Sequence, residues 1–158
     1  MAKAPTEVFK SASCWLGSQG RMNIQLFDGE VTRAEIDAAH ALAEAIFAAH
    51  PEGVISIAVI STKALPRLTD EARKRAEIVT KQLAGKVRAN VQVVEGDGFV
   101  GASVRAILSG FNLFNPARGR IFASVPEAAA WLEAQRDLVD DAKEVVDAIE
   151  SARAAWRR

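Results

Sequence analysis

Glycines 96, 98 and 101 resemble a motif that binds phosphate groups in other proteins. The stretch Gly96-Asp97-Gly98-Phe99-Val100-Gly101 matches G-x-G-x-x-G and lies between a predicted strand and a predicted helix. Such glycines let a pyrophosphate approach a helix N-terminus, but in dinucleotide-binding proteins they follow the first strand of the fold. Here a single short strand is predicted downstream, and it ends in Phe122-Ala123-Ser124, without the expected acidic residue. A tight strand-to-helix turn is therefore the simpler interpretation.

Polar and basic residues follow two of the predicted parallel strands, at the edge where both strands end. Ligands of open α/β sheets lie beyond the carboxyl ends of the strands, and helix N-termini there favour anions. This rim is therefore a candidate site for a phosphate or a lipid head group, and the alternative is a solvated polar rim. The candidate ligand-binding residues are Ser61, Thr62, Lys63, Arg67, Gly96, Gly98 and Arg105.

Residues for catalysis or metal binding are few. The chain has one cysteine, Cys14, and two histidines, His40 and His50, whose spacing fits no zinc motif. Nucleophilic catalysis needs a histidine near a nucleophile. Both histidines lie on or just after the first predicted helix, and Cys14 is expected to be a small buried side chain in a strand. We therefore expect no catalytic residues, no metal and no cofactor.

The spacing of apolar residues predicts the elements that position the rim. Residues 7–27 are expected to form an antiparallel hairpin, and residues 54–60 a strand buried on both faces. A capping box begins a helix at Thr32–Glu35, and a second capping box begins a helix at Ser124–Glu127. A further helix is expected after Thr69. Further elements are a strand at 91–94, a helix at 99–113 and a strand at 121–123. The order β-β-α-β-α-β-α-β-α indicates one α/β domain with a mixed, mostly parallel five-stranded sheet.

The C-terminal part of the chain has neither Gly nor Pro after Pro126. A continuous helix over 125–157 would be about 50 Å long, more than a domain of this size needs to cover its sheet. We divide the chain into a domain at 1–134 and a helical extension at 135–158. The extension either pairs with another helix or folds back on the domain after a bend near 134–137. The 3–4 spaced residues of this interaction helix are Leu138, Ala142, Val145, Ile149, Ala152 and Trp156.

Composition and charge narrow the classes of function. The 158 residues are 49% hydrophobic, and their net charge is zero, which argues against a nucleic-acid-binding protein. Residues 30–52 carry a net charge of −4 and residues 53–89 one of +5, so the chain could still present two charged surfaces to a partner. The longest apolar run is too short to cross a bilayer, and the N-terminus lacks a signal-peptide core. We expect a cytoplasmic protein without a transmembrane segment.

Four stretches resemble the STAS or SpoIIAA-like family. They are FDGEVTRAEID, VISIAVIST, VQVVEGDGFVGASVRAILSGF and RIFASVPEAAAWL, and together they place the likeness at about residues 5–134. The resemblance implies a small non-enzymatic domain that acts in regulation or in binding a protein partner. Some relatives are suspected of binding lipids or nucleotides.

Anti-sigma-factor antagonists of this fold are switched by phosphorylation of a serine in a D-S-x-G motif. The matching stretch here is Arg67-Leu68-Thr69-Asp70-Glu71, which lacks that motif and offers Thr69 instead. Thr69 is thus a candidate phosphorylation site or simply a helix N-cap. We expect a regulatory or protein-interaction domain that dimerises or docks a partner through its C-terminal helix. The alternative is a domain that binds a small anion or a lipid at the strand-end rim.

Overall fold

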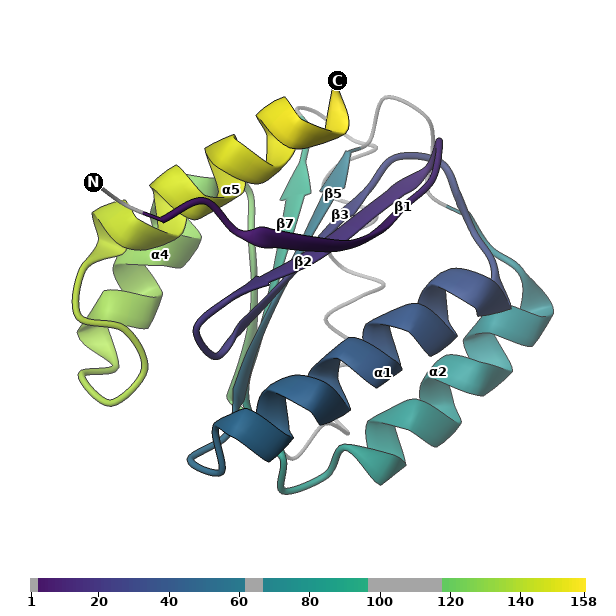
Figure 1. Ribbon diagram of the computed structural model, residues 1–158, viewed down its shortest axis with the longest axis horizontal. Helices are drawn as coiled ribbons and strands as arrows, with labels where there is room; N and C mark the ends of the chain where they lie inside the picture. Colours follow the sequence, from purple (N-terminus) through teal and green to yellow (C-terminus); the bar gives the residue numbers. More distant parts are fainter. Residues whose placement is uncertain (1–2, 62–66, 97–117) are drawn as a thin grey trace.

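A six-stranded sheet forms the middle layer of the computed structural model, and helices cover both of its faces (Figure 1). The structure describes residues 3–61, 67–96 and 118–158. The strand order is β1-β2-β3-β5-β7-β8, in which the first three strands are antiparallel and the last four are parallel. The strands are β1 (Thr6–Lys10), β2 (Cys14–Gln19), β3 (Met22–Phe27), β5 (Val54–Ser61), β7 (Val87–Glu95) and β8 (Arg118–Phe122). The predicted mixed α/β fold is confirmed.

The sheet has one strand more than the sequence predicts. The expected first strand of the hairpin is divided by a turn, in which the Ser11 amide donates to the Cys14 carbonyl at 2.8 Å, so it yields β1 and β2. A separate two-stranded parallel ladder joins β4 (Glu30–Val31) to β6 (Arg67–Leu68). This ladder ties the chain after β3 to the chain before the second helix.

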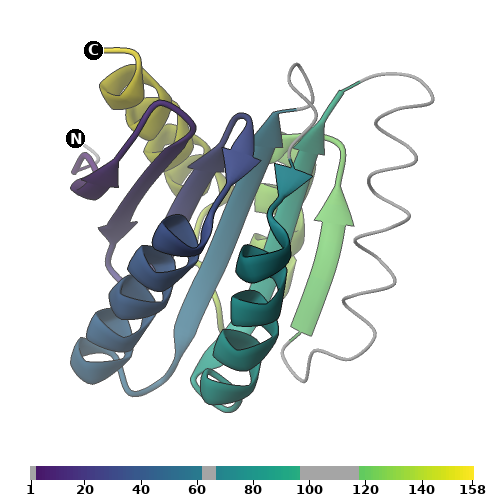
Figure 2. The same cartoon turned by 90° about the vertical axis from the view of Figure 1, so that its right-hand side faces the viewer.

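Helices α1 (Arg33–Ala49) and α2 (Asp70–Gln82) lie on one face of the sheet, and α4 (Val125–Ala134) and α5 (Ala142–Trp156) lie on the other (Figure 2). The predicted capping box begins α1, where the Thr32 amide donates to the Glu35 carboxylate at 2.8 Å. At α4 the Ser124 hydroxyl accepts from the Glu127 amide at 3.4 Å. Both predicted helix starts are confirmed.

Alternation along the strands divides the core between the two faces. Trp15 of β2 and Ile24 of β3 belong to the cluster under α4 and α5. Leu16, the residue after Trp15 in β2, packs under α1. In β5, Ile57 faces α4 and α5, and Ala58 faces α1. The strand β5 therefore contributes side chains to both cores, and this explains why nearly all of its residues are apolar.

The two oppositely charged segments of the sequence pair with one another. Arg75 of α2 lies 2.6 Å from the Asp37 carboxylate of α1, and Lys86 lies 2.9 Å from Glu44. These hydrogen bonds hold the pKa values of Asp37 and Glu44 below their ordinary values. Their contribution to stability is present above those ordinary pKa values and is lost as the pH falls through the lowered ones. Part of the charge that the sequence offered for a docking surface is thus paired within the protein, between α1 and the segment of α2 and Lys86.

Residues 125–157 form two helices and not one continuous helix, because the chain turns back between α4 and α5. Arg136 adopts a φ of 42°, in the left-handed region that ends a helix. The Arg21 guanidinium donates to the carbonyl of Leu138 at 3.1 Å and also to that of Asp137, and so holds the turn. Asp141 then caps α5 by accepting from the Lys143 amide at 2.8 Å. The fold-back alternative is the one that the structure contains.

The 3–4 spaced residues of the predicted interaction helix face the sheet. Ile149 is 0% exposed and Leu138 is 6% exposed, and both belong to the core cluster of Trp15 and Ile24. Val145 and Ala152 are buried in the same cluster, and Ala142 and Trp156 pack against it. The stripe proposed for pairing with another chain is therefore already covered. The predicted domain boundary at residue 134 also divides a single core, to which residues on both sides of it contribute.

We predict that Ile149→Ala destabilises the protein by about 2–5 kcal/mol, because it leaves a cavity under α5. The matched control is Ile78→Ala in α2, where the side chain is 48% exposed and the expected loss is at most about 0.5 kcal/mol. Denaturant unfolding followed by circular dichroism measures both. If Ile149→Ala left the stability unchanged but reduced the mass in light scattering, helix pairing between chains would be the better account.

We also predict that Cys14 is inert in the folded protein. Burial, and secondarily the charge of Glu35, raise the pKa of its thiol from 9.0 to about 12. At pH 8 the thiolate fraction is then about 1000-fold below that of an ordinary cysteine. A disulfide-exchange reagent should modify the thiol at the rate of unfolding, and at once in denaturant. Modification faster than unfolding would contradict this burial.

Candidate functional site

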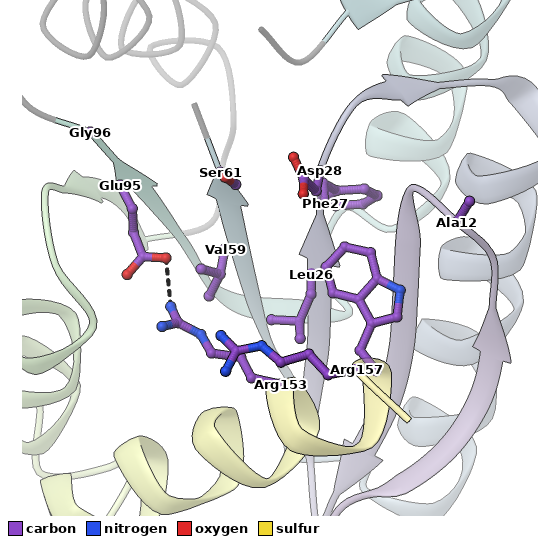
Figure 3. A pocket seen from close by; sticks show the side chains of 11 residues that line it. Ala12, Leu26, Phe27, Asp28, Val59, Ser61, Glu95, Gly96, Arg153 and Arg157 are labelled. Atoms are coloured by element: carbon purple, nitrogen blue, oxygen red, sulfur yellow. Dashed lines mark hydrogen bonds and ion pairs between the residues drawn. The ribbon is translucent and has the colours of Figure 1, made fainter. Parts of the chain in front are cut away.

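A pocket of about 670 Å³ lies at the carboxyl ends of the parallel strands β3, β5 and β7 (Figure 3). Its residues come from three strand ends, from the turn between β1 and β2, and from the last turn of α5. They are Ala12, Leu26, Phe27, Asp28, Val59, Ser61, Glu95, Gly96, Arg153, Trp156 and Arg157. The volume is within the range of small-molecule sites.

The register of the parallel strands brings the pocket residues to one edge. Phe27 of β3 is paired with Ile60 of β5, and Ser61 is paired with Glu95 of β7. All three strands thus end at the same level, so the residues that follow them share one rim. This is the edge at which open α/β sheets bind their ligands.

The floor of the pocket is apolar and belongs to the core. Leu26 and Val59 are almost fully buried and face α5, as their places in the cluster with Ile149 indicate. Trp156 lines the pocket from the helix side, and its indole N–H donates to the Ser11 carbonyl at 3.0 Å. Lys10 donates to the Ala155 carbonyl at 3.1 Å. These two bonds fasten the end of α5 to the edge of the sheet.

Charged side chains form the other part of the wall. Arg153 lies 2.6 Å from the Glu95 carboxylate, a bond that joins α5 to the end of β7 (Figure 3). Arg153 also lies 3.4 Å from Glu150 on its own helix. Arg157 lines the pocket one turn beyond Arg153, and Asp28 lines it from the end of β3. The pocket therefore combines an apolar floor with two guanidinium groups and two carboxylates.

The structure brings together only part of the residue set that the sequence suggested. Ser61 and Gly96 line the pocket. Arg67 lies in β6, where its backbone is paired with Glu30. The remaining candidates, Thr62, Lys63, Gly98 and Arg105, lie outside the described residues, as does most of the glycine motif.

Sequence reasoning missed the contribution of α5 to the pocket. Arg153, Trp156 and Arg157 are spaced i, i+3 and i+4, so they lie on one side of the last helical turn. The sequence shows this spacing, but it does not show the direction of the helix. A helix directed away from the domain would place these side chains far from the strand ends. Only the turn at Arg136 makes them part of the site.

Thr69, the candidate for phosphorylation, caps α2. Its hydroxyl accepts a hydrogen bond from the Ala72 amide at 3.1 Å, and its own amide donates to the Val31 carbonyl at 3.2 Å. Asp70 beside it pairs with Arg73. This is the N-cap that the sequence offered as the alternative, and phosphorylation stays a prediction.

The two histidines lie away from the pocket. His40 is 3.3 Å from Glu44 on α1, and His50, at the end of that helix, is 3.3 Å from Glu52. Helix α1 packs on the opposite face of the sheet from α5. The described part of the chain holds no group of three His, Cys, Asp or Glu side chains that could bind a metal ion. Across residues 3–61, 67–96 and 118–158, every helix is too short or too polar to cross a bilayer.

Comparison with known proteins supports the fold and goes no further. Neither a sequence profile of a known family nor a curated protein matches the chain. A solved structure that resembles it is an uncharacterized protein of the DUF3478 family from Shewanella loihica, described as having a SpoIIAA-like fold. The two chains are 16% identical, the TM-score is 0.54, and the match covers 82% of this chain and 92% of the other. The fold of this chain is SpoIIAA-like, as its sequence motifs suggested.

Proposed function

We propose that this protein is a non-enzymatic binding domain that holds a small anion with an apolar body, or a lipid, in the pocket at the strand ends. The observation that carries the proposal is the pocket itself, in which core side chains form the floor and two arginines of α5 form part of the wall. A ligand with one apolar and one anionic end matches both parts.

The energetics of such a ligand favour binding at this place. Leu26 and Val59 are already almost fully buried, so the apolar surface removed from water on binding is mainly that of the ligand and of Trp156, at about 25 cal/mol per Å². A carboxylate or phosphate held by a guanidinium forms charge-assisted hydrogen bonds, which are stronger than neutral ones. A ligand that lacked either end would leave part of the wall without a matching group.

The absence of catalytic chemistry is part of the proposal. The reactive side chains named from the sequence are occupied elsewhere: Cys14 is buried under α1, and His40 and His50 each lie beside a glutamate on or after that helix. A domain that binds a small molecule without transforming it acts by changing its own stability or its contacts. A regulatory role thus follows from binding, whereas pairing through the apolar stripe of α5 would require that helix to leave the sheet.

We predict that filling the pocket weakens ligand binding without unfolding the protein. Ala12 is exposed at the rim, so Ala12→Trp places an indole over the pocket and leaves the core intact. Binding of the amphipathic anion anilinonaphthalene sulfonate should weaken by about ten-fold or more, equivalent to about 1.4 kcal/mol. Fluorescence titration of the folded full-length chain measures this affinity.

Ala154→Trp is the matched control, because Ala154 is exposed in the part of α5 that supplies Arg153 and Trp156 but does not itself line the pocket. Its affinity for the probe should equal that of the unmodified protein. Circular dichroism checks that both variants are folded. Equal affinities of the two variants would place the probe elsewhere on the surface and would contradict the proposed site.

A further inference from the structure

The charges that line the pocket balance one another. Among the described lining residues, Asp28 and Glu95 are acidic, and Arg153 and Arg157 are basic. The pocket thus presents both signs of charge beside an apolar floor. A site built for a multiply charged anion would instead gather an excess of cations.

The two arginines differ in what they already contact. Arg153 is held by Glu95 at 2.6 Å and by Glu150 at 3.4 Å. Arg157 is exposed at the end of α5 and forms no ion pair with any residue that the structure describes. Arg157 is therefore the guanidinium available to a ligand, while Arg153 mainly neutralises Glu95.

We propose that the pocket selects a singly charged amphiphile, a monocarboxylate with an aliphatic or aryl body, over ligands that carry a dianionic phosphate. The inference rests on the proposed binding function and names the class of its ligand. One carboxylate matches the guanidinium of Arg157, which can bind it through two parallel hydrogen bonds. The apolar body lies on Leu26 and Val59, beside Trp156.

A second negative charge on the ligand meets repulsion. It would lie near the carboxylate of Asp28, in a pocket whose apolar floor screens charges less than water does. Arg153 could serve it only by giving up its 2.6 Å bond to Glu95. The Glu95–Arg153 ion pair therefore disfavours the binding of phosphates, and it also connects α5 to β7.

Calorimetric titration of the full-length chain with octanoate, octyl phosphate and octanol at pH 8 tests this selection. The three probes share one apolar body and carry one, about two and no negative charges. Octanoate should bind about ten-fold or more tightly than either of the others. Octyl phosphate binding as tightly as octanoate would overturn the selection while leaving the pocket as the binding site. If none of the three bound, octanol included, the proposed function itself would be overturned.

Two substitutions identify the groups that make the selection. Arg157→Ala should weaken octanoate binding about 10- to 100-fold, as expected for loss of a charged hydrogen-bond partner. Arg158→Ala, at the neighbouring exposed arginine outside the pocket, is the matched control and should leave the affinity unchanged. Asp28→Asn should tighten octyl phosphate binding about 3- to 10-fold. Equal effects of the two arginine variants would overturn the role of Arg157, and an unchanged affinity of Asp28→Asn for octyl phosphate would overturn the role of Asp28.

Discussion

The burial of α5 against the sheet is the packing interaction on which the pocket depends. Val145, Ile149 and Ala152 reach the face that carries Trp15 and Ile24, and this contact removes a continuous apolar stripe from water. It also fixes where the helix ends. Because the last turn stands over the ends of β3 and β5, Arg153 and Arg157 become part of the wall around Leu26 and Val59 (Figure 3). The same hydrophobic contact thus stabilises the fold and assembles the site.

The other face of the sheet is held together differently. Asn23 is buried under α1, where it donates to the Ala39 carbonyl at 3.5 Å, and Gln25 donates to the Ser56 hydroxyl at 3.0 Å. The ion pairs between α1 and α2 are partly exposed, and such pairs contribute little to stability. The face of α4 and α5 therefore carries the larger continuous apolar core. This asymmetry explains why the end of α5 is firmly placed although it lies near the C-terminus.

Much of the fold follows from local patterns in the sequence, because alternation and helix caps are local signals. The capping box at Thr32 and the β-branched run at 54–60 predict α1 and β5 well. The end of α4 does not follow, since Arg136 is an ordinary residue in a left-handed conformation that tertiary contacts with Arg21 sustain. The 3–4 spaced stripe is equally suited to a coiled coil and to packing on a sheet. Of the rim residues named from the sequence, Ser61 and Gly96 line the pocket, whereas the pocket residues of α5 were not named as part of it.

Ligand binding and the position of α5 are linked by the way the pocket is built. The last turn of the helix is attached to the sheet by three polar contacts: Lys10 to the Ala155 carbonyl, Trp156 to the Ser11 carbonyl, and Arg153 to Glu95. A ligand that touches both Arg157 and the strand ends adds a fourth connection between the same two parts. By linkage, any such ligand stabilises the docked helix by RT ln(1 + L/Kd), an amount that grows with the concentration L and the affinity of the ligand. In the proposed binding domain, the concentration of a small molecule would in this way control the order of one helix end.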